Sequence, residues 1–439
     1  MGLSVNDRFQ GTYEICVLGC KVNQYDAQQI RCVLEQAGFR RGGKEERVSV
    51  AVVHSCAVTA EAARKSRRTI RRMRSKHPGA YLILSGCLAS DDSYAGPLDA
   101  QIRVPPGPGW LGRFARGIEA LPGVSCPVSL PGDPDSLALD RFAGHTRAFL
   151  KIQDGCHIGC SYCIVPRLRR APRDKDLPLI LEEARRLVES GHREIVVSGV
   201  SVGLYGGGRA VSLADVMRAL VDLPGTERLR LSSLHPAELT DKLLEVWGAS
   251  PKMMPHIHLP LQSGSDRILA AMRRGYGVSE FLNAVERVRA VMDKPACTTD
   301  VIVGFPGETD EDFRCTLDVC RAVGFSRVHV FPYSVRPGTA AAARSGRVSR
   351  DVVAERSAVL RATGRDLARA YHERFLGETV RVLIERRRNG TGEGYTEQYI
   401  PASVAEGGHD GNGILEVRVV QADAEGVRGH PGVGAAGTS

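Results

Sequence analysis

Short apolar runs and longer amphipathic stretches alternate over residues 13–126. The apolar runs are YEICVLGC, VSVAVVHSC and AYLILSGC, and the intervening NQYDAQQIRCVLEQAG and EAARKSRRTIRRMRSK have helical spacing. This order predicts a small α/β domain with a parallel sheet. Each run ends in a cysteine, at Cys20, Cys56 and Cys87. Because the carboxyl ends of parallel strands meet at one edge, we expect these thiols to converge as shared ligands; three buried structural thiols are the alternative.

The patterning changes twice further along the chain. Residues 104–136 contain PPGPGW and LPGDPDS, which predict a linker or irregular connection. From about residue 147 to 370, strand and helix patterns alternate in about six units without a Rossmann phosphate loop, which predicts a full or partial β/α barrel. After about residue 375, short β runs divided by glycines predict a small β-barrel. We therefore expect an α/β protein with domains over 11–126, 142–373 and 375–437.

Composition limits the class of protein. The 439 residues are 43% hydrophobic and 25% charged, with no apolar run near the ~18 residues needed to cross a bilayer. The start, MGLSVNDRFQGT, does not resemble a secretory signal, so we expect a cytoplasmic protein without a membrane partner. In that reducing compartment the twelve cysteines are more suited to metal binding, catalysis or burial than to disulfides.

The strongest chemical signal is a C-x-x-x-C-x-x-C motif, Cys156, Cys160 and Cys163, directly after the first strand of the predicted barrel. Three thiolates at this spacing can hold one [4Fe–4S] cluster and leave its fourth iron open. That iron can bind the amino and carboxylate groups of S-adenosylmethionine (SAM), and the reduced cluster can cleave SAM to a 5′-deoxyadenosyl radical. The alternative is a zinc site completed by His157 or by a distant residue.

This triplet on a β/α barrel resembles the radical SAM superfamily. LGCKVNQYDAQQI, HSCAVTAEAARKSRR, SGCLAS, HLPLQSGSDRILAAMRRGY and TTDVIVGFPGETDEDF, followed by a closing β-domain, resemble the methylthiotransferases from end to end. The resemblance implies an N-terminal methylthiotransferase domain with an auxiliary cluster, a radical SAM core, and a C-terminal RNA-binding TRAM domain. It also implies an electron donor and a sulfur source as partners.

Carried onto this sequence, the resemblance implies two [4Fe–4S] clusters with three cysteine ligands each. The three strand-end cysteines would bind the auxiliary cluster, and the C-x-x-x-C-x-x-C triplet would bind the cluster that cleaves SAM. A sulfur held at the auxiliary cluster would be methylated by one SAM and passed to a substrate radical made with another. The other cysteines are interpreted as small buried hydrophobes: Cys16, Cys32, Cys126, Cys297, Cys315 and Cys320.

Weaker signals concern SAM itself. Tyr162 resembles the aromatic residue that flanks the adenine of SAM in this superfamily, although packing is the alternative. Gln262 and the Ser198-Gly199 turn lie at predicted strand ends, where they would meet polar groups of SAM or only cap a turn. His256 and His258 alternate along one predicted strand and are interpreted as structural. No side chain is assigned to catalysis.

The distribution of basic residues indicates RNA. RKSRRTIRRMRSK, residues 64–76, contains eight basic residues and no acid, which favours contact with phosphates over an ordinary solvated helix face. A second run, Arg386-Arg387-Arg388, lies in the predicted terminal barrel. A tRNA anticodon stem-loop, with its unstacked bases, is the expected partner.

CKVNQYD at residues 20–26 resembles the branch of the family that acts at carbon 2 of N6-threonylcarbamoyladenosine at position 37 of tRNA. The alternatives are isopentenyladenosine in tRNA, a ribosomal-protein aspartate, or, in another class, an RNA-binding iron–sulfur sensor. Three positions depart from the family pattern: His54 replaces an Asn, His235 replaces an acid after paired serines, and Arg169-Arg170-Ala171 replaces an Arg-Gly pair. All six motif cysteines are retained.

Overall fold

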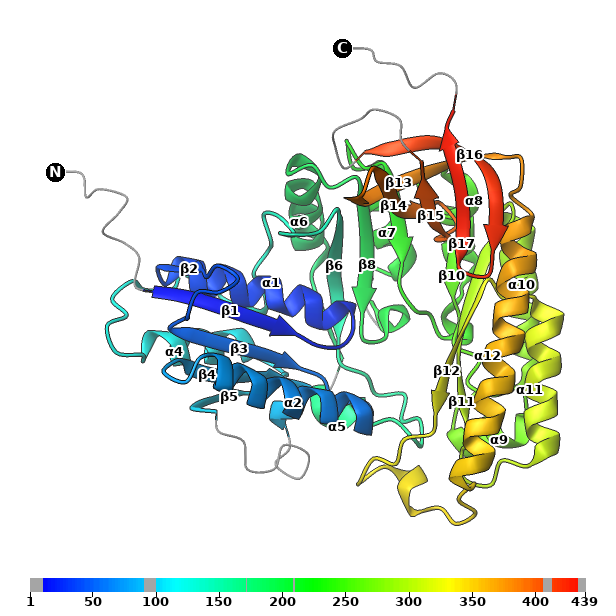
Figure 1. Cartoon of the computed structure of the whole chain (residues 1–439), viewed down its shortest axis with the longest axis horizontal. Helices are drawn as coiled ribbons and strands as arrows, with labels where there is room; N and C mark the ends of the chain where they lie inside the picture. The colour runs from blue at the N-terminus through cyan, green and yellow to red at the C-terminus, as the bar shows by residue number, and fades with distance from the viewer. Residues whose placement is uncertain (1–10, 91–99, 171, 208–209, 406–412, 433–439) are drawn as a thin grey trace.

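The structure is a computed structural model that describes residues 11–90, 100–170, 172–207, 210–405 and 413–432; Ala171 lies outside these ranges. Figure 1 shows three parts in chain order: a blue and cyan sheet domain, a green and yellow set of strands with helices outside them, and a red β-barrel packed against the central part. This arrangement confirms the predicted α/β class with its terminal barrel.

The N-terminal part is a five-stranded parallel sheet in the order β2-β1-β3-β4-β5. Its strands are β1 (Gly11–Val17), β2 (Phe39–Arg41), β3 (Val50–Ser55), β4 (Tyr81–Gly86) and β5 (Ile102–Val104). Helices α1 (Lys21–Gln36) and α4 (Trp110–Glu119) pack with one face of the sheet, and α2 (Ala60–Lys76) packs with the other. The three predicted strands are present, and β2 and β5 are short additional strands.

The prediction of an irregular connection over 104–136 was wrong at α4. Trp110, Phe114 and Ile118 recur at helical spacing within this Pro- and Gly-rich segment and are all buried. Gly109 precedes the helix at φ 68°, a left-handed conformation that favours glycine. The apolar face of α4 covers sheet surface that α1 leaves open. Burial of that surface is a long-range effect, and it outweighs the helix-breaking tendency of the neighbouring prolines and glycines.

The central part is an open barrel of six parallel strands with one short antiparallel strand at its edge. The order β7-β6-β8-β9 continues through an isolated Leu229–Met253 bridge toward β10-β11-β12. The strands are β6 (Arg147–Asp154), β7 (Arg173–Asp174), β8 (Glu194–Gly199), β9 (Arg228–Leu231), β10 (His256–His258), β11 (Ala296–Val303) and β12 (Arg327–Pro332). The predicted partial β/α barrel is thereby confirmed.

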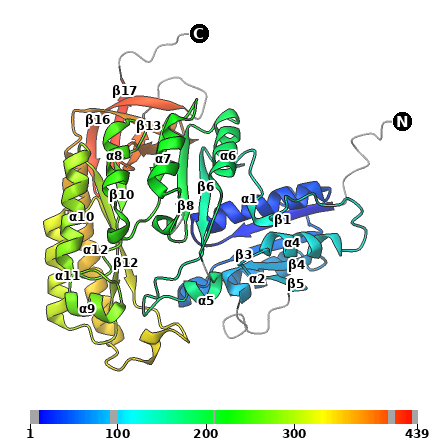
Figure 2. The same ribbon diagram turned by 180° about the vertical axis from the view of Figure 1, so that it is seen from behind.

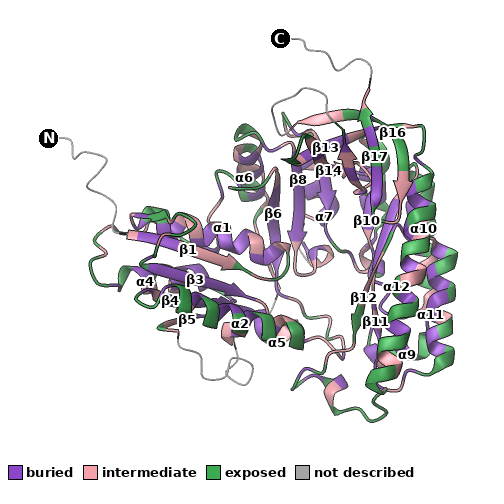
Figure 3. Cartoon of the chain, in the orientation of Figure 1, coloured by how far each residue is buried: buried purple, intermediate pink, exposed green. Residues whose placement is uncertain are grey.

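Helices cover the outside of this barrel, as Figure 2 shows from behind. They are α6 (Leu177–Glu189), α7 (Leu213–Asp222), α8 (Asp241–Ala249), α9 (Asp266–Met272), α10 (Val278–Val291), α11 (Asp310–Val323) and α12 (Arg350–Glu373). The short helix α5 (Val165–Arg169) lies against the N-terminal domain instead, where Leu168 joins its core (Figure 2). Short 3-10 turns are η2 (Cys87–Ser90), η3 (Pro134–Ser136), η4 (Val202–Leu204), η5 (Pro236–Glu238) and η6 (Ala340–Ala343). Strands are mostly buried, whereas α10 and α11 expose their outer faces (Figure 3).

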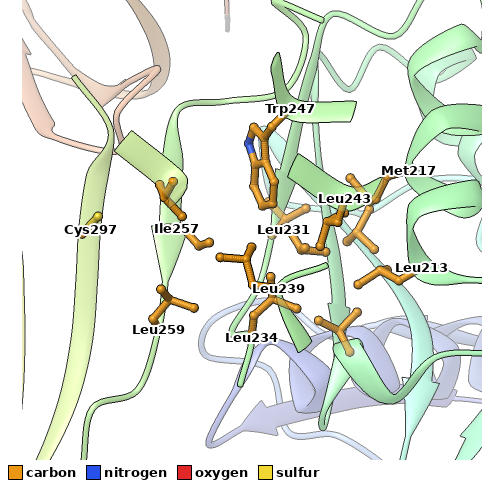
Figure 4. Packing of buried hydrophobic residues seen from close by; sticks show 14 of the residues in the cluster. Leu213, Met217, Leu231, Leu234, Leu239, Leu243, Trp247, Ile257, Leu259 and Cys297 are labelled. Carbon is orange, nitrogen blue, oxygen red and sulfur yellow. The ribbon is translucent and has the colours of Figure 1, made fainter. Parts of the chain in front are cut away.

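The main core lies between the barrel strands and these helices. Figure 4 shows Leu213 and Met217 of α7, and Leu243 and Trp247 of α8, meeting Leu231 at the end of β9. Burial of each large apolar side chain contributes about 1.5–3 kcal/mol, so this layer fixes the helices to the strands.

The C-terminal part is a closed barrel in the order β13-β14-β15-β17-β16. Its strands are β13 (Thr379–Arg388), β14 (Thr391–Thr396), β15 (Pro401–Val404), β16 (Ile414–Asp423) and β17 (Gly426–Pro431). It packs at the end of the central barrel where the strands begin: Arg230 donates to Glu397 O at 3.1 Å, and the Tyr399 ring lies 5.0 Å from His256. No described helix is long and apolar enough to span a membrane.

A buried network of charges joins the N-terminal sheet domain to the central barrel. Asp26 of α1 pairs with Lys151 of β6 and, at 3.1 Å, with Arg169 of α5. Arg169 also pairs with Asp154, the last residue of β6, at 2.9 Å. The four side chains are at most 8% exposed. Charges alternate through the network, so each buried ion is compensated by its neighbours.

We predict that Asp26→Ala destabilises the junction by about 3–5 kcal/mol, because Lys151 and Arg169 then stay buried with one carboxylate fewer. The shift of the first urea unfolding transition measures this change. The control is Asp140→Ala, since Asp140 is 83% exposed and pairs only with half-exposed Arg186. Its loss should cost at most about 1 kcal/mol. Equal shifts for the two variants would contradict the network's role.

This contribution should also depend on pH. Burial alone would raise the pKa of Asp26, but the charges of Lys151 and Arg169 outweigh burial and hold that pKa below its usual range. A depressed folded pKa stabilises the protein above the unfolded value of about 3.9, and the benefit is lost as the pH falls through and below that value. The difference between wild type and Asp26→Ala is therefore expected to be constant above about pH 5 and to shrink in acid.

Candidate active site at two three-cysteine loops

The strand-end triplet, Cys20, Cys56 and Cys87, lies at one edge of the N-terminal sheet. Cys56 directly follows β3, and Cys87 opens η2 directly after β4. Cys20 lies three residues beyond β1 and caps α1. Since β1, β3 and β4 are parallel neighbours, their carboxyl ends bring the three thiols together. Cys20 and Cys87 both act electrostatically on the Cys56 thiol.

Two side chains hold these strand ends in place. Asn23 donates to Leu18 O at 2.7 Å and to Ser55 O at 2.9 Å, so it links the turn before Cys20 to the end of β3. Ser66 Oγ of α2 bonds both backbone groups of Cys56, at 3.1 and 2.8 Å. Gly19 has φ +107°, and a Cβ there would lie 2.9 Å from Cys56 Cβ. Only glycine therefore fits beside the second cysteine.

The loop triplet, Cys156, Cys160 and Cys163, follows β6 and is anchored to the far side of the barrel. Ser161 donates from its backbone to Met272 O at 2.9 Å and from its hydroxyl to Ala271 O at 2.8 Å. Arg274 Nη1 lies 3.2 Å from Cys160 Sγ, and Arg274 Nε lies 3.2 Å from Tyr276 Oη. Arg274 was missed from the sequence because nothing in MRRGY distinguishes the arginine that faces the cysteine loop.

The spacing of the sulfur atoms bears on the kind of metal. Among the described residues, the only three ligand-type side chains whose donor atoms all lie within 4.8 Å of one another are His258, Asp300 and His329. Neither cysteine triplet meets that limit, whereas a tetrahedral zinc ion with ~2.3 Å bonds would hold its sulfurs about 3.8 Å apart. A larger cubane cluster fits three more widely spaced thiols, and it suits soft thiolate donors.

Burial favours the protonated form of four of the six triplet thiols. Burial raises the pKa of Cys56 and of Cys163 to about 12, and it also raises the pKa of Cys87 and Cys156. For Cys87 the charge of Arg169 acts in the opposite direction. Metal ligands must be thiolates, so cluster assembly has to expel these protons.

Arg169 and His54, two of the positions that depart from the family pattern, lie between the two triplets. Arg169 Nη2 donates to Asn23 Oδ1 at 2.7 Å, while its Nη1 bonds Asp154, two residues before Cys156. His54 is buried, with Nδ1 3.2 Å from Ser85 Oγ and Nε2 3.7 Å from Asp26. Both residues therefore belong to the domain junction, which fixes the position of one cysteine triplet relative to the other.

At the third departure, His235 stands where the family pattern has an acid. Glu238, three residues later, brings a carboxylate to this place instead. The His235 backbone N–H donates to Glu238 Oε2 at 2.8 Å, and Ser201 Oγ lies 3.3 Å from Glu238 Oε1. Glu238 acts electrostatically on Cys156, so a carboxylate is present beside this loop. Burial, reinforced by the charge of Arg274, lowers the pKa of His235 to about 4, which keeps the imidazole neutral near pH 7.

Of the four residues expected to meet SAM, Ser198, Gly199 and Gln262 lie at or near strand ends, and Tyr162 lies in the cysteine loop. Tyr162 is half-buried against Ile268, Met272 and Phe305 in a small separate core cluster. Gln262 is 9% exposed with φ 65°, and its backbone pairs with β11. The Ser198 hydroxyl is buried and donates within its own strand to Val196 O at 3.1 Å. A Cβ at Gly199 would lie 3.0 Å from Gln153, which marks a close approach of β6 and β8.

Gln153 was not found from the sequence. Its amide donates to Asp154 O and Gly155 O at 3.1 and 2.8 Å, and its carbonyl accepts from Ser201 N at 2.9 Å. It therefore ties the start of the loop triplet to the turn after β8. A glutamine inside an apolar strand is the only sequence signal that could have indicated this role.

Comparison with known proteins places the chain among relatives along nearly its full length. Residues 150–320 match the family model described as Radical SAM superfamily, and residues 12–97 match the one described as Uncharacterized protein family UPF0004. The chain is 36% identical to the threonylcarbamoyladenosine tRNA methylthiotransferase MtaB of Thermotoga maritima, covering 95% of this chain and 96% of that protein. It is 34% identical to the MtaB of Bacillus subtilis, covering 92% and 93%.

A second group of relatives carries another substrate name. The tRNA-2-methylthio-N(6)-dimethylallyladenosine synthase of Mycobacterium bovis is 36% identical, with 87% of this chain and 77% of that protein covered. Among solved structures, the radical S-adenosylmethionine methyltransferase TsrM of Kitasatospora setae superposes with a TM-score of 0.54 at 14% identity, over 87% of this chain and 80% of that one. That likeness concerns the fold alone.

We predict a fixed order of thiol alkylation in the metal-free, reduced protein at pH 8. Exposed Cys20 should react first, while Cys56 and Cys163 react slowly because burial raises the pKa of each thiol to about 12. Peptide mass spectrometry after timed iodoacetamide treatment measures the order. Buried Cys320 serves as the slow reference. Rapid modification of Cys56 or Cys163 in folded protein would contradict the geometry of the triplets.

Proposed function

The chain belongs to the radical SAM methylthiotransferase family, and on this premise we propose that it inserts a methylthio group at carbon 2 of N6-threonylcarbamoyladenosine at position 37 of tRNA. The observation that carries the proposal is the nearly full-length similarity to relatives named for this reaction. The placement of both cysteine triplets at strand ends, joined by one buried network, supports it. We also propose that the enzyme works in the cytoplasm.

We assign an auxiliary [4Fe–4S] cluster to the strand-end triplet and the SAM cluster to the loop triplet. When bound, these groups supply the electron that cleaves SAM and the site at which the transferred sulfur is held. The chain's own residues provide thiolates, charge balance and shape. Arg274 lies beside Cys160, and Arg169 lies near Cys20 and Cys87, so a cation accompanies each set of thiolates.

We assign the SAM-facing positions to the rim of the central barrel. Gly199 lets β6 and β8 approach closely without a side chain in the way, and Gln153 Oε1 accepts from Ser201 N in the turn after β8. Glu238 carries hydrogen-bond acceptor oxygens next to the loop triplet, and Tyr162 adds an aromatic face there. These groups suit a ligand with an amine, a carboxylate and an adenine. The reductant and the sulfur source come from outside the chain.

Two triple variants test the assignment of the clusters. Replacing the loop triplet with alanine should leave about four irons per chain instead of about eight and abolish 5′-deoxyadenosine formation. Replacing the strand-end triplet should also leave about four irons, but 5′-deoxyadenosine should still form while the 2-methylthio nucleoside disappears. Anaerobic iron analysis and nucleoside mass spectrometry measure both effects. Loss of 5′-deoxyadenosine in both variants, with about four irons retained, would contradict the division of roles.

The basic helix α2 presents a free cationic face. Some of its basic residues are paired locally: Arg64 with Glu61, Lys76 with Glu14, and Arg74 with Gln101. Three others are exposed at intervals of three residues and form no hydrogen bond or ion pair with the described part of the chain: Lys65, Arg68 and Arg71. An unpaired row on one helix face suits contact with phosphates of the tRNA backbone.

We predict that replacing Lys65, Arg68 and Arg71 with Gln weakens tRNA binding without altering sequence preference. Each lost phosphate contact should reduce the slope of log affinity against log salt by about 0.7–0.9. Fluorescence anisotropy of labelled tRNA at several salt concentrations measures the slope. The matched control replaces three arginines paired with acids, Arg185, Arg193 and Arg218. An equal change of slope in the control would mean that only net charge matters.

A further inference from the structure

Three polar side chains on adjacent strands of the central barrel form a compact group that the cysteine chemistry does not use. His258 ends β10, Asp300 lies in β11 and His329 lies in β12. His258 Nε2 lies 3.4 Å from Asp300 Oδ2, and the rings of His258 and His329 have centroids 5.9 Å apart. The group remains accessible, since the side chains of His258 and Asp300 are 17% and 30% exposed.

His256 and His258 therefore differ in role. His256 is buried against Tyr399, as its structural interpretation requires. The His258 ring is instead positioned by Thr298 Oγ1, 2.9 Å from Nδ1, and turns its other nitrogen toward Asp300. A partly exposed, hydrogen-bonded histidine beside a carboxylate can serve as one wall of a binding site.

A cation from the N-terminal domain lies near this wall. Lys21, the first residue of α1, acts electrostatically on His329. Its own electrostatic neighbours include Tyr399, Arg230 and Arg147. Arg230 and Arg147 are compensated by Glu194 and Glu385 respectively. Lys21 is half-buried and forms no hydrogen bond or ion pair with any described residue. Glu194 acts on it electrostatically but already pairs with Arg228 and Arg230.

This arrangement favours an anionic organic ligand over a metal ion. Thr298 and Asp300 already occupy the two ring nitrogens of His258, and the nearby charge of Lys21 opposes a divalent cation. A half-buried ammonium without a counter-ion is stabilised by a carboxylate. Asp300 can accept from N–H or O–H groups of the same ligand.

We propose that Lys21 binds the carboxylate of the threonylcarbamoyl substituent on the substrate base, with His329 beside it and the His258–Asp300 pair receiving its polar hydrogens. This inference rests on the proposed function, because the ligand is part of the proposed substrate. A dimethylallyl substituent has no charge and would leave Lys21 desolvated and unpaired. Lys21 is therefore the residue that selects the substrate.

The test uses full-length protein with both clusters reconstituted anaerobically, and three synthetic anticodon stem-loops. They carry N6-threonylcarbamoyladenosine, its methylamide with the carboxylate removed, or isopentenyladenosine. Wild type should prefer the acid over the amide by about 10–100-fold in kcat/KM, the range for a hydrogen bond to a charged group. In Lys21→Met, kcat/KM for the acid should fall by that factor and the preference should approach one. Lys44→Met, an exposed lysine outside the site, should keep the preference.

Iron content and 5′-deoxyadenosine formation without RNA establish that each variant holds its clusters. Because Lys21 adjoins Cys20, Lys21→Gln and His329→Leu provide second variants; the first should lose the preference and the second should reduce it. If wild type modifies the acid but Lys21→Met and Lys21→Gln keep the preference with full iron, this inference fails alone. If wild type modifies only isopentenyladenosine, the proposed function and the inference fail together. Stoichiometric zinc lost in His258→Ala, with an unchanged preference, would also overturn the inference.

Discussion

The buried network of Asp26, Lys151, Arg169 and Asp154 is the interaction on which the rest of the structure depends. It joins the first helix of one domain to the first strand of the next, and the ions are almost fully removed from water. Such pairs add little net stability compared with apolar packing, but a missing or displaced partner is costly. The network therefore fixes the position of the two domains relative to each other. That position determines how the two cysteine triplets are placed relative to each other.

The start of α1 concentrates several tasks within seven residues. Cys20 belongs to the strand-end triplet, Asn23 ties two strand ends together, and Asp26 enters the buried network. Lys21 projects its charge toward the central barrel. Because these side chains share one short rigid element, a shift of the helix would disturb the thiols, the domain junction and the substrate contact at once.

Much of the fold could be predicted because its signals are local. Apolar runs ending in cysteine gave the parallel strands, and repeated strand–helix patterns gave the open barrel. The helix α4 was missed because prolines and glycines around Trp110 mask its periodicity, while the need to cover the sheet is a long-range effect. The short strands β2 and β5 were missed because three residues carry no periodic signal.

The sequence by itself determined the chemistry of the loop triplet, since Cys156, Cys160 and Cys163 lie on one loop and their spacing is a local property. Only the tertiary structure decided which distant groups surround it. Asp26 meets Lys151 across 125 positions, and Arg274 meets Cys160 across 114. The position of such partners depends on strand register and on how two domains pack, and neither leaves a periodic trace in the chain. Residue types could therefore predict the reaction, whereas Lys21, Arg169 and Glu238 became interpretable only in three dimensions.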